Sequence, residues 1–338
     1  MRNPSLFVSA VVTLLGLFLS PSASGQIVFQ DNFDSGTSVL TWTFRQSGPD
    51  ADANFAYDYS EIGIPSAPHS NGTTIGMRFL VNQGLDPAST AGTFQGISAQ
   101  PVDEFGEPRA FTGDFRIRFD AWMNVIGPFP AGGVGSTQMM TYGWGSNGNS
   151  TQWAGATSSL LFAASGDGGT SQDYRVYRGT GGAPMLPSTG VYAAGTVDPV
   201  AGDPNNSQNN VDPYYLPLGG KMAPDAQLAK YPNQTGITAD GTFGMAWRDV
   251  VIEKIDTTVT WSVDGLRIAT VPIDGITFGG EDIVFGMFDI NANASTDPND
   301  FLNAAIFDNI VVETLPEPSS VLMLGFAGVA LGIRRGRR

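Results

Sequence analysis

An alternation of apolar and polar side chains over residues 115–125 is the clearest pattern in the chain. The apolar positions are every second residue, namely Phe115, Ile117, Phe119, Ala121, Met123 and Val125. The residues between them are mostly polar: Arg116, Arg118, Asp120, Trp122 and Asn124. A period of two with one apolar face predicts a half-buried antiparallel β-strand.

Shorter runs of the same kind, bounded by turn residues, predict further strands along the chain. They lie at 27–33, 40–45, 74–80, 138–144, 158–164, 174–177, 247–255, 258–263, 266–271, 283–290 and 305–312. Asp264 and Gly265 separate two of these runs and are a strong signal for a two-residue β-hairpin. Many short strands punctuated by turns predict an antiparallel β-sandwich.

The stretch 179–241 lacks this periodicity. Asp, Asn and Pro crowd its middle, which is typical of a loop. We expect a long insertion that acts either as a binding flap or as a surface decoration, because loops of this length are usually functional or mobile. Residues 225–230 within it could form a short helix.

Composition supports a turn-rich β protein, with 43 glycines, 22 prolines and only 14% charged residues. The absence of cysteine excludes disulfides, a thiolate nucleophile and cysteine-ligated metals. The single histidine, His69, follows a Pro-rich stretch over 65–68, which predicts an exposed loop. We therefore do not expect a catalytic triad built on this histidine.

Residues 1–25 have the order of a secretory signal peptide. Arg2 precedes an apolar run over 6–19, and small residues follow up to Gly25. These small residues predict cleavage after Gly25, so that the mature chain begins at Gln26. The apolar run is shorter than the roughly 20 residues that a retained membrane helix needs.

Residues 316–338 carry a second targeting pattern. They begin with Pro316, Glu317 and Pro318 and continue with an apolar stretch over 321–333. A basic cluster ends the chain: Arg334, Arg335, Arg337 and Arg338. This order resembles the PEP-CTERM sorting signal of Gram-negative bacteria.

That resemblance implies recognition by an exosortase-type enzyme, cleavage near the Pro-Glu-Pro motif, and delivery to the cell surface or the extracellular matrix. The apolar stretch rises only about 20 Å as a helix, which barely crosses the hydrocarbon core. It suits a transient anchor in the inner membrane, with its arginines on the cytoplasmic side. A tail that is retained as a simple anchor is the alternative.

Charge narrows the range of partners. The whole chain has a net charge of −15, and after removal of both ends 12 of its 17 basic and 31 of its 32 acidic residues remain, which gives about −19. Such a surface disfavours nucleic acids and anionic lipids as partners, and it favours divalent cations. We expect contact with the membrane only through the tail before processing.

Several segments of the domain 26–315 resemble the concanavalin-A-like and laminin-G-like jelly rolls. The segment 259–265 ends a strand in Val-Asp-Gly, and 307–312 reads Phe-Asp-Asn-Ile-Val-Val. The opening segment 31–36 and the segment 285–289 fit the same pattern. The resemblance implies an all-β antiparallel β-sandwich, a concanavalin-A-like jelly roll with a long loop insertion, whose first and last strands are neighbours.

Candidate binding chemistry lies in aromatic side chains. Sugar rings stack on exposed aromatics while their hydroxyls form directed hydrogen bonds. Tyr142, Trp144 and Trp153 flank or lie in a Gly-, Asn- and Ser-rich stretch and are the candidate platforms, although core packing is the commoner role of such residues. We expect Trp144 and Trp153 to be the most exposed large aromatics outside the insertion.

A glycosidase of this fold would need acidic residues at alternate positions of one strand, Glu-x-Asp-x-Glu, and the sequence contains no such stretch. The jelly-roll resemblance suggests a structural calcium ion instead. Asp34 and Asp308 would supply carboxylates, with backbone carbonyls near Gly36 adding ligands. Alternatively, Asp34 caps its turn and Asp308 accepts hydrogen bonds from backbone amides.

The sequence as a whole therefore favours an exported surface or matrix protein of a Gram-negative bacterium. Its jelly-roll domain would be noncatalytic and would serve adhesion or exopolysaccharide contact. A polysaccharide-active glycoside hydrolase or lyase and a purely structural matrix component are the alternatives.

Overall fold

The computed structural model describes residues 25–83, 93–129, 137–154, 156–167, 172–179, 183–195, 198, 211–292 and 298–316. Gln26–Leu315 form one compact unit. Except for their border residues Gly25 and Pro316, the expected signal peptide and sorting tail lie outside the described residues. The part of the chain that is described contains no helix with the length and apolarity required to cross a membrane.

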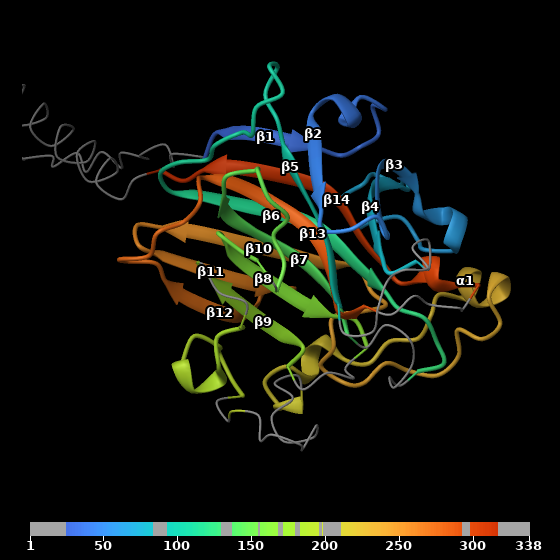
Figure 1. The fold of residues 1–338 in the computed structure, drawn as a ribbon. Coiled ribbons are helices and arrows are strands. Elements are labelled where there is room, and N and C mark those ends of the chain that lie inside the picture. The colour runs from blue at the N-terminus through green and yellow to red at the C-terminus, as the bar shows by residue number, and fades with distance from the viewer. Residues whose placement is uncertain are drawn as a thin grey trace, which may run out of the picture. The chain divides into compact units, whose positions relative to one another are not determined.

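Two antiparallel sheets pack face to face (Figure 1). In the described residues the larger sheet has eight strands, β12 (Leu266–Pro272), β11 (Thr258–Val263), β10 (Arg248–Ile255), β6 (Phe115–Asn124), β14 (Ala304–Thr314), β4 (Ile75–Val81) and β3 (Ala51–Asp58), with β1 (Ile27–Asp31) also paired to β14. The smaller sheet has six, β2 (Trp42–Gln46), β5 (Thr93–Pro101), β13 (Asp282–Ala292), β7 (Gln138–Ser146), β8 (Leu160–Ser165) and β9 (Tyr174–Arg178). This arrangement confirms the expected all-β antiparallel sandwich.

Helical segments are short. They are α1 (Asp225–Lys230) and the 3₁₀ helices η1 (Ser38–Leu40), η2 (Tyr59–Ile62), η3 (Pro187–Thr189), η5 (Leu216–Leu218) and η6 (Asp300–Leu302). The helix expected at 225–230 is therefore present. Each of the twelve strands expected from the sequence is also present, with both ends within two residues of the expected positions.

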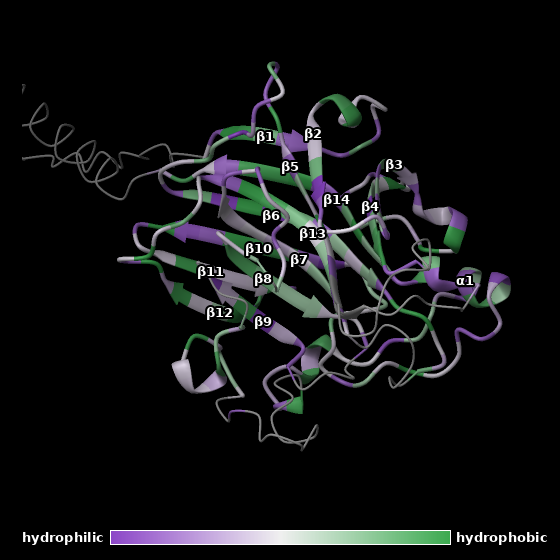
Figure 2. Cartoon of the chain, in the orientation of Figure 1, coloured by the Kyte–Doolittle hydropathy of each residue, from purple (hydrophilic) through white to green (hydrophobic). Residues whose placement is uncertain are grey.

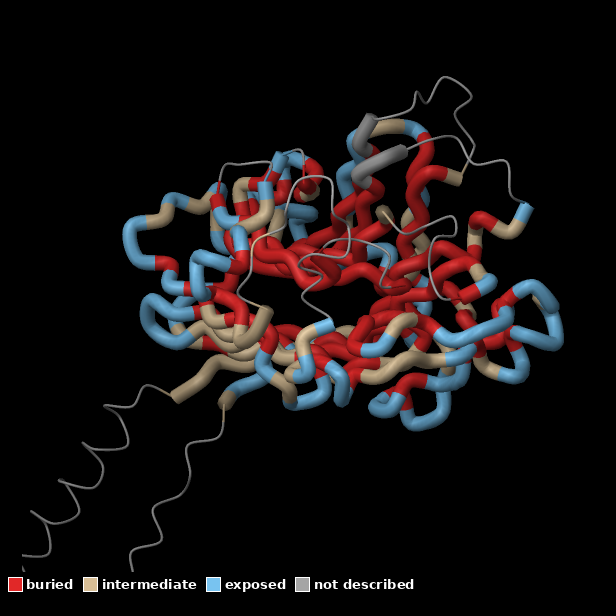
Figure 3. The backbone as a smooth tube through the Cα atoms, turned by 90° about the horizontal axis from the view of Figure 1, so that it is seen from below, coloured by how far each residue is buried: buried red, intermediate tan, exposed pale blue. Residues whose placement is uncertain are grey.

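Aromatic side chains join the two sheets. The ring centroid of Phe119 on β6 lies 5.0 Å from that of Tyr142 on β7 and 4.9 Å from that of Phe285 on β13. Edge-to-face pairs of this kind contribute about 0.5–1.5 kcal/mol each beyond the burial of their area. Figure 2 shows hydrophobic and hydrophilic residues alternating along the strands, and Figure 3 shows the buried residues gathered between the exposed loops. The apolar face predicted for residues 115–125 is thus the core face of β6.

The insertion closes one end of the sandwich. In its described part, the backbone N–H of Met185 donates to Val176 on β9, at 2.7 Å between N and O. The backbone of Ala193 donates to Ile268 on β12, at 2.9 Å. Because β9 and β12 are the outermost strands of the two sheets at this end, one segment covers both edges.

The second half of the insertion packs on the outer face of the larger sheet. Gln227 of α1 is fully buried, and its amide donates to the carbonyl of Ile62 and to Oδ1 of Asn124, each at 3.0 Å. Gln234 donates to Oε1 of Gln227 at 3.0 Å. The described parts of the insertion therefore belong to the packed body.

Strand β14 changes its neighbour in the middle. Residues Ala305–Phe307 pair with β4, whereas Ile310–Glu313 pair with β1. The register on β6 shifts between Asp308 and Val311, and Asn309 has a φ of 53°, in the left-handed region that asparagine tolerates better than most residues. The first and last strands are neighbours, as expected. The register shift of β14 lies where its neighbour changes from β4 to β1, beside the groove described next.

Candidate functional site

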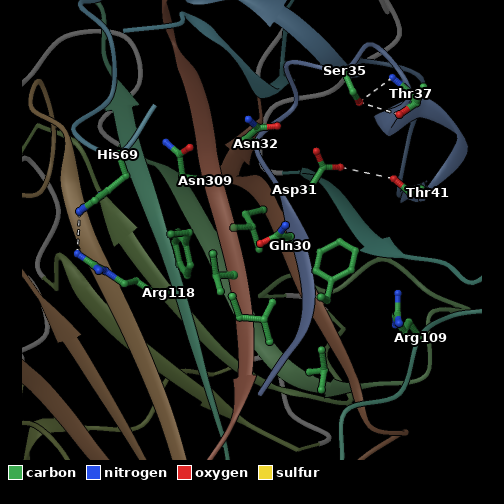
Figure 4. Close-up of a pocket in the computed structure, with 16 residues that line it drawn as sticks. Gln30, Asp31, Asn32, Ser35, Thr37, Thr41, His69, Arg109, Arg118 and Asn309 are labelled. Carbon is green, nitrogen blue, oxygen red and sulfur yellow. Dashed lines mark hydrogen bonds between the residues drawn. The ribbon is translucent and has the colours of Figure 1, made fainter. Parts of the chain in front are cut away.

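A groove with a volume of about 930 Å³ runs along β1, β14 and β6 (Figure 4). Its polar lining comes from several elements: Gln30 and Asn32 at the end of β1, His69 in the loop before β4, Arg109, Arg118 on β6, and Asn309 on β14. Apolar residues of β1 and β14 complete the lining. The groove therefore combines hydrogen-bonding groups with apolar surface.

A buried carboxylate organises one side of the groove. Asp120 on β6 is fully buried, and its Oδ1 lies 2.8 Å from Nδ1 of His69. Its Oδ2 accepts hydrogen bonds from the His69 backbone N–H at 3.1 Å and from the Asn309 side chain at 2.9 Å. These donors compensate the burial of the charge. They also fix the His69 imidazole and the Asn309 amide at the groove.

The protonation of His69 follows from its other neighbour. Nη2 of Arg118 lies 2.8 Å from Nε2 of His69. A guanidinium can only donate, so Nε2 must accept and the ring hydrogen must be on Nδ1, where it points at Asp120. His69 is therefore neutral in this arrangement. Arg118 is also held by Asp249, which accepts from Nε at 2.7 Å and from Nη2 at 3.1 Å.

Among the described residues that line the groove, Asp31 is the only acid. Its Oδ1 accepts from the backbone N–H of Phe33 at 2.7 Å and from the hydroxyl of Ser38 at 2.9 Å. Its Oδ2 accepts from Nε1 of Trp42 at 2.9 Å. The carboxylate therefore holds the turn after β1 together.

The expected aromatic platforms are elsewhere. Tyr142 is fully buried, and Trp144 is only 7% exposed, with its Nε1 donating to the carbonyl of Phe111 at 3.0 Å. Trp153 is partly buried and packs on the outer face of the smaller sheet. The expectation that Trp144 and Trp153 are the most exposed large aromatics is therefore wrong, since Phe105 is 80% exposed.

Strand geometry explains this difference. Tyr142 and Trp144 occupy alternate positions of β7 and point into the core with the rest of that face. The small polar residues that follow them belong to the strand end and its turn, and do not change the face on which the two rings lie. The structure does not bring the three aromatics together, and buried rings offer no face on which a sugar can stack.

The expected calcium ligands do lie near one another. Oδ2 of Asp34 accepts from the Thr73 hydroxyl at 3.2 Å. The Tyr59 hydroxyl lies 3.1 Å from the carbonyl of Thr73 and 3.0 Å from Oδ2 of Asp308. Gly36 is exposed in the turn beside Asp34. Within the described ranges, no three His, Cys, Asp or Glu side chains are grouped so that they could hold a metal, and calcium here stays a prediction.

Asp308 is best described as a neutral acid. It is fully buried, and this burial raises its pKa from the usual 3.8 to about 8. The charges of Asp120 and Asp34 add to the rise, and the contacts with Tyr59 and the Asn309 backbone oppose it. The Tyr59 oxygen also accepts from the Ala67 N–H at 3.1 Å. Tyr59 has one hydrogen, and the Thr73 carbonyl can only accept it. A protonated Asp308 that donates to Tyr59 therefore satisfies all three contacts.

Local sequence patterns did not reveal this site. Asp120 is 51 residues from His69 and 189 from Asn309 in the chain. Their contact depends on how β6 and β14 pair and on where the loop before β4 folds. The available signals were an acidic residue in the middle of an otherwise core-forming strand and an Asp-Asn pair inside the last strand.

Comparisons with known proteins place the fold only broadly. No family model matches the chain, and no curated protein is similar to it. A Bacillus subtilis protein of unknown function with a galectin-like fold has 11% identity and a TM-score of 0.37, over 86% of this chain and 96% of that one.

Two solved enzyme structures are similar to the same degree. An endo-acting O-glycanase of human gut bacteria has 10% identity and a TM-score of 0.39, over 86% of this chain and all of that one. An endo-β-1,3-glucanase from Pyrococcus furiosus has 11% identity and a TM-score of 0.39, over 86% of this chain and 94% of that one. TM-scores this low assign neither a ligand nor an activity to this chain.

Proposed function

We propose that the sandwich is a noncatalytic polysaccharide-contact domain of an exported surface or matrix protein. The groove along β1, β14 and β6 carries this proposal. It presents the amides of Gln30 and Asn309 and the guanidinium of Arg118 beside apolar surface from β1, where Ile27 is 52% exposed. Ligand sites of this kind combine apolar walls with a few polar groups that fix orientation, and sugars offer hydroxyls for those groups.

The acid-base content of the groove supports a binding function over hydrolysis. Most glycosidases use two carboxyl groups on either side of the scissile bond. Of the described lining residues only Asp31 is acidic, and four donors hold its carboxylate beside the turn after β1. A polysaccharide-active enzyme with its site elsewhere is the second candidate, and turnover of labelled glycans would reveal it.

Export and sorting are proposed from the sequence alone. The signal peptide at 1–25 and the Pro-Glu-Pro tail at 316–338 together favour passage through the inner membrane, transient anchoring there, and processing by an exosortase-type partner. The destination would be the cell surface or the extracellular matrix.

Glycan-array binding of the processed protein tests the proposed function. Gln30→Ala removes an exposed amide from the groove and should weaken binding of any captured polysaccharide about fivefold, the value of one hydrogen bond. Gln46→Ala removes an equally exposed amide from β2, outside the groove, and should leave binding unchanged. A protein that binds no glycan on the array would be a structural matrix component instead.

A further inference from the structure

The charges of the groove point to a more specific ligand. We infer that the groove selects an acidic polysaccharide and that Arg109 and Arg118 bind carboxylate groups on its sugar residues. This inference rests on the proposed polysaccharide contact and names the class of polymer. It follows from unused donors on the two guanidinium groups that line the groove.

Two arginines line the groove of an otherwise acidic protein. The chain has a net charge of −15, yet the described lining residues include two arginines and a single acid. That acid, Asp31, already accepts four hydrogen bonds, from Phe33, Ser38, Thr41 and Trp42. Surface charges beyond about 8 Å are largely screened at physiological ionic strength. Asp249 pairs with Arg118 at 2.7 Å, so the groove carries no large net positive charge. A ligand there would be recognised by hydrogen bonds directed from Arg109 and Arg118.

Arg118 has N–H groups that no described residue uses. Its Nε and Nη2 hydrogens go to Asp249 and His69, whereas its Nη1 makes no hydrogen bond with any described residue. The side chain is 47% exposed. Asp249 and His69 thus fix the guanidinium, and the hydrogens on Nη1 remain available to an incoming carboxylate.

Arg109 supplies the second cation. It is exposed and has no ion pair with any residue that the structure describes. Its guanidinium carbon lies 5.6 Å from the centre of the Phe29 ring, a cation–π contact that holds it against β1. Figure 4 shows Arg109 on one side of the groove and the His69–Arg118 pair on the other, with Gln30 and Asn32 between them. Two separated cations suit a polymer with repeated charges better than one small anion.

Guanidinium groups bind carboxylates through parallel hydrogen bonds, and these charge-assisted bonds are stronger than neutral ones. The amides of Gln30 and Asn32 would meet the hydroxyls between two charged sugars. A neutral polymer could use only the amides. The groove should therefore bind a polyuronate more tightly than the same polymer without its charges.

The test compares matched polymers on the processed, full-length mature protein. Polygalacturonate and alginate are each measured against their carboxyl-reduced forms, which keep the sugar backbone and lose the charge. We expect at least one uronate polymer to bind about tenfold more tightly than its reduced form, as a charge-assisted bond requires. Dextran sulfate is included to separate carboxylates from other anions, and tighter binding of dextran sulfate would overturn the carboxylate assignment.

A matched pair of arginine variants locates the effect. Arg109→Gln should weaken uronate binding about tenfold and leave the reduced polymer unaffected. Arg116→Gln is the control, because Arg116 lies on the same strand as Arg118, forms ion pairs with Glu253 and Glu313, and does not line the groove. Both variants change the net charge equally. Melting curves of both variants establish that they are folded.

The outcomes separate the two levels of the proposal. Equal binding of charged and reduced polymers, weakened by Gln30→Ala, would overturn the acidic ligand and keep the polysaccharide contact. Equal losses in Arg109→Gln and Arg116→Gln would show a general charge effect and also overturn the inference. Binding of neither form, together with an empty glycan array, would overturn the proposed function itself.

Discussion

Replacing Asp308 with asparagine tests the buried neutral acid at the centre of the larger sheet. Asparagine has the shape of a protonated carboxyl group: its amide can donate to the Tyr59 oxygen, and its carbonyl can accept from the Asn309 backbone, whose N lies 2.7 Å from Oδ1. Asp308→Asn therefore keeps the hydrogen bonds of the neutral acid. It removes only the ability to ionise.

The expected effect depends on pH in a definite direction. The folded-state pKa of Asp308 is raised by burial to about 8, above the usual 3.8. The folded state therefore holds the proton more tightly than the unfolded chain. The resulting stabilisation is complete below the unfolded pKa and is lost as the pH rises through the folded one. Between pH 5 and pH 8 this loss amounts to roughly 4 kcal/mol, at about 1.4 kcal/mol per pH unit.

Urea unfolding of both proteins at a series of pH values measures the effect. The free energy of unfolding of the wild type should fall from pH 5 to pH 8 more steeply than that of Asp308→Asn, so that the variant gains relative stability by roughly 4 kcal/mol over this range. Asp282 provides a comparison, because burial raises its pKa only to about 6. The advantage of Asp282→Asn should level off about two pH units earlier.

Parallel pH profiles for the wild type and Asp308→Asn would refute the reasoning. They would mean that Asp308 has the same pKa folded and unfolded, and that it is ionised in the fold at neutral pH. The Tyr59 hydrogen would then have to go to Asp308 and leave the Thr73 carbonyl without it. A constant offset between the two stability profiles would indicate a packing change that does not depend on the protonation of Asp308.

Three further predictions concern the ends and the insertion. If calcium binds at Asp34 and Asp308, it must displace the Asp308 proton. Added calcium should therefore raise the melting temperature more at pH 9 than at pH 6. Melting curves that change with neither calcium nor chelator at both pH values would exclude the site. Intact-mass measurement of the native surface protein should give a chain from about Gln26 to near Leu315, and recovery of the arginine tail would contradict the cleavage. Gln227→Ala should lower the free energy of unfolding in urea by about 3 kcal/mol, because it leaves the buried Ile62 carbonyl, Oδ1 of Asn124 and the Gln234 amide without this partner. A loss below about 0.5 kcal/mol would show that this contact of the insertion does not stabilise the sandwich.

The strands were predictable where alternation was regular, as in residues 115–125, because a period of two is a local property of the chain. Two strands escaped prediction. β5 contains Gly96 and ends at Pro101, residues that usually interrupt strands, and β3 has an irregular register between Asn54 and Tyr57. Both strands are held by pairing with distant segments, which a local pattern does not record.

The candidate site was harder to predict than the fold. Small polar neighbours predict that the candidate aromatics are exposed. The side-chain direction of Tyr142 and Trp144 is nevertheless set by the alternation of β7 itself. The groove depends on contacts between residues far apart in sequence, such as Asp120 with His69. Arg109 and Arg118 line the same groove only because β6 and the segment before it fold beside β1 and β14.

The segment from Met185 to Ala193 also bears on how copies of this protein can assemble. An exposed outermost strand invites the strand of another chain, which leads to aggregation or fibres. By hydrogen bonding to both β9 and β12, this segment occupies some of the positions that an incoming strand would need. This cover disfavours fibre growth at this end of the sandwich, in a protein that has no disulfides. Copies in a matrix would have to be joined there through side chains or through a shared polymer, and not through a continuous sheet.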